Sequence, residues 1–236
     1  HTPPMEMLLM FLMNNSIDEP VTRWEEMFLP AELEEVVTNF EYVDAQGNKV
    51  PLISEELVNY DADRAPVPDT VPTHWPGALL FGLLMGGGAG LLGRPYFKAA
   101  DATPSRPAKG WRVAFGLYNA LIGLVVGIPG LALAVMWIVT DHTVTYHGEN
   151  LFLGNPLTFL LLPLGIALAV GSTRARGWLR SLWMVLAGLG LILLPLTLLP
   201  FFAQHNLLPI VSILPLLLGF GLVWWRLGAP KPAAEA

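Results

Sequence analysis

The sequence contains no cysteine among its 236 residues. This absence excludes disulfide bonds, thiolate metal sites and thiol catalysis by this chain. It identifies no redox compartment, because a protein on either side of a membrane can lack cysteine. Charge is also scarce: 14% of the residues are charged, whereas a soluble domain carries about 25%. No basic stripe could neutralise nucleic-acid phosphates, so nucleic-acid binding is not expected.

The acidic residues are concentrated in one part of the chain. Residues 1–73 contain 15 of the 19 acidic residues and only three basic ones. The remaining residues, 74–236, are mostly apolar and raise the mean hydropathy of the whole chain to +0.52. We therefore expect an acidic segment over residues 1–73, a membrane domain over residues 74–228 and a short tail over residues 229–236.

The acidic segment carries local signals of a small α+β fold. Residues 5–13 form an apolar run broken by Glu6, which as a helix rises about 14 Å and is too short to cross a bilayer. We expect a buried or interfacial helix there, an amphipathic helix over residues 31–39 and a hairpin over residues 40–53. A segment with so few apolar residues does not readily sustain an independent core. We therefore expect residues 1–73 to be the tail of a larger domain.

Five apolar stretches follow, and each is near the roughly 20 residues that a helix needs to cross the bilayer core. They lie at residues 76–93, 113–139, 156–172, 179–202 and 207–225. Inside a bilayer every backbone polar group must be bonded within the protein, which favours helices. The sequence therefore predicts a mostly α, polytopic membrane protein with five transmembrane helices.

The basic residues of the membrane domain predict its orientation. They follow the first, third and fifth stretches, whereas the loops at 140–155 and 203–206 contain neither Lys nor Arg. By the positive-inside rule the basic side faces the cytoplasm. The C-terminus would then be cytoplasmic and the N-terminal segment periplasmic, in a bacterial inner membrane. Because nothing after His1 resembles a signal peptide that would translocate this segment, we expect a fragment or a processed product.

Glycines on the first apolar stretch predict a helix-packing face. Gly82, Gly86 and Gly90 form two overlapping GxxxG units, which let a second helix approach closely. A protein partner could bind through the same helix. Prolines inside the later stretches favour helix kinks. For these glycines and prolines alike, the alternative to a role in packing is that they line a cavity.

Polar residues gather on the side opposite the basic loops. The candidates for a lipid or substrate face are Asp141, His142, Asn150, Asn155 and His205. Three interpretations stay open: residues that solvate loop ends, a lipid or substrate site, and a metal site through His142 and His147, which loop spacing alone does not bring together. No ionisable residue lies deep in a stretch, which argues against an ion pathway. No nucleotide or hydrolase motif is present, so we predict neither metal nor cofactor.

Three runs of sequence resemble one bacterial family. They are FLMNNSIDEPVTRWEEMFLP at 11–30, GNKVPLISEE at 47–56 and TDHTVTYHGENLFLGNPL at 140–157. The first two are similar to the end of the periplasmic domain in the Lnb family of lipoprotein N-acyltransferases. The third resembles a loop pattern of that family, matched here by Asp141, His142, Asn150, Leu151, Asn155, Pro156 and Leu157. The family couples this domain to five transmembrane helices, so the resemblance covers nearly the whole chain.

The resemblance implies an enzyme that moves an acyl chain from a phospholipid to the N-terminal amine of a lipoprotein. The family's periplasmic domain resembles papain-like peptidases, in which a His-activated Cys thiolate would carry the acyl chain as a thioester. This chain has no Cys, so we assign it no catalytic residue, His1 included, and expect the Cys and His upstream. The alternative is a non-catalytic membrane subunit or anchor of a larger complex.

Overall fold

The computed structural model describes residues 3–14, 20–57, 59, 73–100, 106–200, 202, 204 and 206–228. The chain divides into two compact units. One unit combines His1–Ile17 with Thr73–Ala236, and the other is Asp18–Pro72. This division differs from the boundary that we expected at residue 73, because the first helix packs against two helices of the membrane domain.

The smaller unit is built from short elements. It contains α2 (Arg23–Glu26), α3 (Pro30–Thr38), β1 (Glu41–Val43) and β2 (Lys49–Pro51). The two strands pair antiparallel, as the hairpin pattern predicts, and Gly47 supplies the positive φ of 88° that their turn needs. None of the described residues between 20 and 59 is buried, and the apolar face of α3 remains partly exposed through Leu33.

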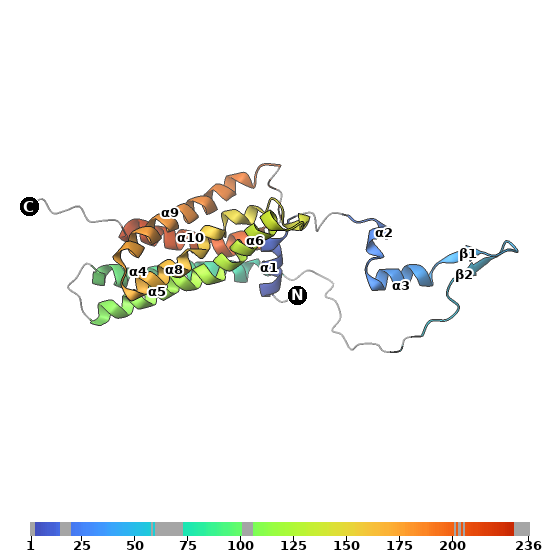
Figure 1. The fold of residues 1–236 in the computed structure, drawn as a ribbon, viewed down its shortest axis with the longest axis horizontal. Coiled ribbons are helices and arrows are strands. Elements are labelled where there is room, and N and C mark those ends of the chain that lie inside the picture. Colours follow the sequence, from blue (N-terminus) through green and yellow to red (C-terminus); the bar gives the residue numbers. More distant parts are fainter. Residues whose placement is uncertain are drawn as a thin grey trace, which may run out of the picture. The chain divides into compact units, whose positions relative to one another are not determined.

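The larger unit is a helical bundle (Figure 1). Its elements are α1 (Pro3–Leu12), α4 (Trp75–Ala100), α5 (Arg106–Val125), α6 (Gly127–Val139), the one-turn 3₁₀ helices η2 (Thr143–Thr145) and η3 (Glu149–Phe152), α7 (Pro156–Phe159), α8 (Leu161–Val170), α9 (Thr173–Leu196) and α10 (Leu207–Leu227). The longest close pairings are α4 with α10 and α5 with α8.

Four helical segments among the described residues are long and apolar enough to cross a membrane. They are Trp75–Ala99, Lys109–Val139, Thr173–Leu196 and Leu207–Leu227. The third predicted stretch, at 156–172, forms a shorter apolar helical segment, Pro156–Val170. Four of the five predicted spans therefore have the expected length, and the stretch at 156–172 does not.

Proline explains why two apolar stretches are each divided into two helices. A proline lacks the N–H that would bond the carbonyl four residues earlier. Pro129 removes the donor for Val125, where α5 ends, and Pro163 removes the donor for Phe159, where α7 ends. Each helix resumes two residues later, so each interruption is confined to one residue.

Close packing of α4 on α10 depends on two glycines. A Cβ on Gly86 would lie 2.5 Å from the Pro215 carbonyl oxygen, and a Cβ on Gly82 would collide with the Ser212 carbonyl oxygen. Gly90 differs, because a Cβ there would meet no atom within 4 Å. Two of the three predicted glycines thus lie at the helix–helix contact and the third does not.

A second glycine contact, which our sequence analysis missed, joins α5 to α8. A Cβ on Gly116 would lie 2.6 Å from the Ala169 backbone nitrogen, and a Cβ on Gly165 would lie 2.6 Å from the Gly116 carbonyl oxygen. Each glycine is followed four residues later by alanine, so two small-xxx-small pairs face each other.

A buried polar bond ties α9 to α5 inside the bundle. Trp183 Nε1 donates to Asn119 Oδ1 at 2.7 Å, and Asn119 Nδ2 donates to the Phe115 carbonyl at 2.7 Å. The Trp183 ring stacks on Phe220 of α10 with 4.2 Å between ring centroids. Three helices therefore meet at one tryptophan, whose side chain is fully buried.

Candidate functional site

The loop between α6 and α7 begins exposed, and its later part packs into the bundle. Thr145, Glu149 and Asn150 within it are buried. Asn155 ends the loop as the N-cap of α7, where its Oδ1 accepts from the backbone N–H groups of Leu157 and Thr158. Irregular backbone at the membrane is tolerated where protein surrounds it, and this loop meets that condition.

Polar side chains of this loop and of the segment before α10 bind the C-terminal end of α1. Asn150 Nδ2 donates to the carbonyls of Met10 at 2.9 Å and Phe11 at 3.2 Å. Gln204 Nε2 donates to the carbonyls of Met10, at 3.3 Å, and Met13. The last carbonyls of a helix have no partner within the helix, so these two amides supply what α1 lacks.

Further contacts hold both ends of α1. After the helix, the Asn14 backbone N–H donates to the Val144 carbonyl at 2.6 Å. In its first turn, Glu6 Oε2 pairs with Nδ1 of His74, the residue just before α4. The short helix is therefore fixed to the α6–α7 loop at one end and to the start of α4 at the other. Both attachments lie at the bundle end that carries no Lys or Arg, which we call the α1 end.

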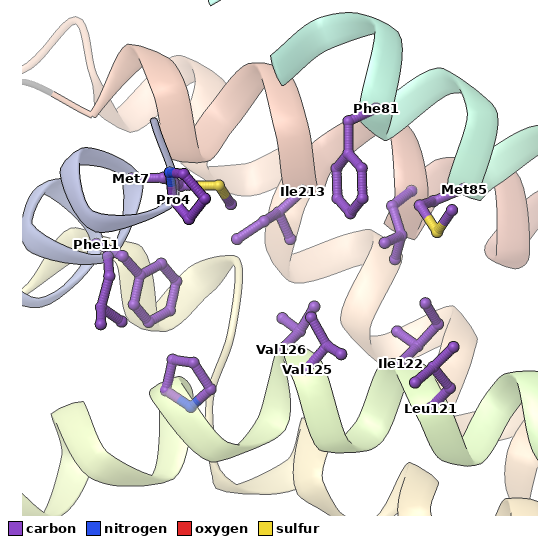
Figure 2. A pocket seen from close by; sticks show the side chains of 13 residues that line it. Pro4, Met7, Phe11, Phe81, Met85, Leu121, Ile122, Val125, Val126 and Ile213 are labelled. Atoms are coloured by element: carbon purple, nitrogen blue, oxygen red, sulfur yellow. The ribbon is translucent and has the colours of Figure 1, made fainter. Parts of the chain in front are cut away.

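An apolar cavity of about 470 Å³ lies beneath α1, and we call it the α1 slot (Figure 2). Each of its 13 lining residues is apolar. The side chains come from α1, from α4, from α5 with the start of α6, and from α10, and include Met7, Phe11, Phe81, Met85, Ile122 and Ile213. Its volume lies in the range of about 300–1,000 Å³ typical of small-molecule sites.

The α1 slot extends into the apolar depth of the bundle. Phe81 and Met85 follow Trp75, the first residue of α4, by six and ten residues, which is about 9 and 15 Å along a helix. The slot therefore begins near the α1 end and reaches roughly half of a 30 Å hydrocarbon layer.

Glu149 is a buried carboxylate in the loop between α6 and α7. Its Oε1 accepts from the Gln204 backbone N–H at 3.1 Å, and its Oε2 accepts from Asn206 Nδ2 at 3.2 Å. Burial raises the pKa of the Glu149 carboxyl above its ordinary value of 4.5, and these two hydrogen bonds oppose the rise. Glu149 also lines a second cavity of about 700 Å³, which we call the Glu149 cavity.

The predicted site residues differ in their exposure and contacts. Asp141 and His142 are exposed in the loop, whereas Asn150 and Asn155 are buried and hold α1 and α7. His205 lies outside the described residues. Among the residues that the structure describes, no group of three His, Cys, Asp or Glu side chains could hold a metal ion.

The sequence analysis assigned no role to Glu149, Gln204 or α1. The signal that could have pointed to Glu149 and Gln204 was an acid and an amide in two loops that contain no basic residue. Comparisons with protein-family models, with curated proteins and with solved structures found no significant match. The candidate site therefore rests on the slot, the attachment of α1 and the buried carboxylate.

Replacing Asn150 with alanine is expected to loosen α1. The substitution leaves the Met10 carbonyl with only its long hydrogen bond from Gln204, and it removes the donor to the Phe11 carbonyl. A buried polar group that loses its partner costs about 1–3 kcal/mol of stability. Hydrogen exchange at the amides of residues 7–12 should accelerate roughly tenfold or more. Asn39→Ala, which removes a comparable amide-to-carbonyl bond on α3, should leave these rates unchanged. Unaltered exchange in the Asn150 variant would show that the amide does not hold α1.

Proposed function

We propose that this chain is the membrane-embedded part of a bacterial lipoprotein N-acyltransferase, and that the α1 slot holds an acyl chain of the phospholipid donor. The observation that carries the proposal is the slot itself, an apolar space that runs inward from the α1 end. An acyl chain needs such a space because hydrocarbon gains free energy only by leaving water for apolar surroundings. The resemblance of three sequence runs to the Lnb family supplies the reaction.

The proposal places the α1 end at the periplasmic face of the inner membrane. All described Lys and Arg side chains of the membrane helices lie toward the opposite end, which the positive-inside rule assigns to the cytoplasm. The slot then opens where both the donor phospholipid and the lipid anchor of a lipoprotein reside. The acidic segment would also be periplasmic, and the catalytic Cys and His would come from residues outside these 236.

A fifth membrane crossing belongs to the proposal as well. The segment from Asn155 to Val170 runs along α5 and α6: Arg112 Nε donates to the Ala169 carbonyl at 3.3 Å, and Gly130 packs against Asn155. Eighteen residues separate Arg112 from Gly130, which corresponds to about 27 Å of helix. That length approaches the roughly 30 Å hydrocarbon core, so the segment together with its flanking residues would cross most of the layer.

An anchor for a larger complex is the second candidate function. Exposed apolar side chains in the acidic segment favour this function: Trp24 is 80% exposed and Phe28 is 93% exposed. Exposed aromatic side chains of this kind often bind a partner. In an anchor, however, the α1 slot would have no role in transfer, so a slot substitution separates the two functions.

Val125→Trp is expected to lower acyl transfer by roughly tenfold, because the indole would occupy the α1 slot and displace the chain from its aligned position. Val125 lines the slot but is half exposed, so a larger side chain fits without repacking the core. The measurement is the fraction of N-acylated lipoprotein, by mass spectrometry, in cells that depend on the full-length protein.

The matched control is Leu124→Trp. Leu124 is the neighbour of Val125 on α5 and is similarly exposed, but it does not line the slot. Its transfer should equal that of the wild type at equal membrane abundance. Full transfer by the Val125 variant, with the protein present at normal levels, would remove the slot from the reaction and favour the anchor.

A further inference from the structure

The Glu149 cavity combines a buried acid with aromatic walls. The exposed fraction of Glu149 is only 5%. Glu149 nevertheless lines a space of about 700 Å³ together with Trp137, His147, Phe152 and Phe202. We propose that this cavity binds the ammonium group of a membrane-anchored amine. The proposal concerns binding alone and does not depend on acyl transfer.

Charge is the first argument. Buried carboxylates are normally paired with a cation, because an isolated buried charge is costly. The described part of the chain contains two acid–base pairs, Lys49 with Glu41 and His74 with Glu6, and neither includes Glu149. The acid that has lost most of its water therefore has no cationic partner among the described residues. A cationic ligand would supply one.

Hydrogen-bond capacity is the second argument. A carboxylate has about four acceptor positions, and Glu149 uses two of them, for the Gln204 backbone N–H and for Asn206 Nδ2. These bonds orient the group, and no other described residue donates to its carboxylate. An ammonium ion, which has three donors, could use the other two positions. Burial raises the pKa of Glu149, and a bound ammonium group would lower it again by favouring the charged form.

The cavity walls are the third argument. The ring of Phe152 meets Phe202 at 6.3 Å between centroids, and Trp137 meets His147 at 5.7 Å. Aromatic rings attract cations, and their apolar surface also suits the lipid portion of an amphiphile. His147 holds a φ of 54°, a left-handed conformation that is uncommon for a residue other than glycine. Histidine is one of the few residue types that adopt this conformation with some frequency.

Two membrane-anchored amines share the required chemistry. One is the head group of an aminophospholipid such as phosphatidylethanolamine. The other is the free α-amine of a polypeptide that carries a diacylglyceryl group. Both present a primary ammonium ion next to apolar chains at the membrane surface, so the test uses both and compares each with a partner that lacks the amine.

The test measures ligand binding to the full chain in detergent micelles by native mass spectrometry. The probes are dihexanoyl phosphatidylethanolamine against dihexanoyl phosphatidylglycerol, and a diacylated lipopeptide with a free α-amine against its N-acetylated form. We expect tighter binding of the amine in at least one pair, and Glu149→Gln should weaken that binding about tenfold, the usual effect of losing a hydrogen bond to a charged group. The pair that responds identifies the source of the amine.

Glu34→Gln is the matched control, since it removes the same charge from an exposed position on α3, and it should bind as the wild type does. Glu149→Gln should fold. Its oxygen can still accept from the Gln204 backbone N–H, and the Asn206 amide can turn to present its own oxygen to the new NH₂ group. The pKa of Glu149 is raised in the folded state, so the charged form costs stability as pH rises above 4.5, and the neutral amide avoids that cost. A folded Glu149→Gln protein that binds both amines as tightly as the wild type would overturn the proposal. Equal binding within both probe pairs would do the same. Neither outcome depends on whether acyl transfer fails.

Discussion

Trp183→Ala is expected to lower the free energy of unfolding by about 3–5 kcal/mol, the usual loss when a buried tryptophan is truncated. The side chain has no exposed surface and contacts two other helices, through its stacking on Phe220 and its bond to Asn119. The variant leaves a cavity and an Asn119 oxygen without its donor. The midpoint of thermal unfolding in detergent should fall by roughly 6–20 °C.

Trp178→Ala provides the comparison on the same helix. Trp178 is 68% exposed, so its removal should change the free energy of unfolding by less than about 0.5 kcal/mol. Trp183→Phe keeps most of the ring and removes only the N–H donor, and its loss should lie between the two. Equal losses for Trp183→Ala and Trp178→Ala would mean that the three helices do not meet at Trp183.

Gly86→Leu is expected to separate α4 from α10. Even a Cβ would lie 2.5 Å from the Pro215 carbonyl oxygen, and backbone atoms cannot rotate away as a side chain can. Overpacking of this kind costs about 1–3 kcal/mol, occasionally more. The unfolding midpoint in detergent should fall accordingly, with a larger protease-sensitive fraction.

Gly90→Leu tests whether the contact, and not the glycine pattern, causes that loss. Gly90 belongs to the same GxxxG series, but a Cβ on it would meet no atom within 4 Å. Its substitution should therefore be nearly neutral. If Gly86→Leu and Gly90→Leu were equally harmful, the effect would come from helix propensity or membrane insertion, and the close approach to Pro215 would be refuted.

The apolar stretches predicted where the membrane helices lie, but not where they end. The stretch at 76–93 became α4, which continues to Ala100, and the stretch at 179–202 became α9, which begins at Thr173. Both extensions lie on the basic side. Long basic side chains can lie along a helix and place their charge in the interface, so a helix continues after its hydropathy has fallen. Apolarity alone therefore sets the helix centres and misses the basic ends.

The site was harder to predict because its contacts are distant in sequence. Asn150 donates to the carbonyl of Met10, 140 positions earlier, and Gln204 donates to the same carbonyl across 194 positions. The run at 5–13 was predicted to be a helix of the acidic segment, since its apolar surface specifies burial but not the surface that buries it. The positions of Gly82 and Gly86 followed from spacing, whereas Gly90 shows that spacing does not reveal which face of a helix is covered.

Photo-crosslinking of the full-length protein with a phospholipid that carries a diazirine in its acyl chain tests the central claim most directly. If the α1 slot holds an acyl chain, crosslinks should be enriched on Met7, Met85 and Ile122 and should decrease in the Val125→Trp variant. Enrichment only at exposed positions such as Leu84 and Ile138, which are 61% and 81% exposed, would contradict the account. The chain would then meet lipid only at its outer surface.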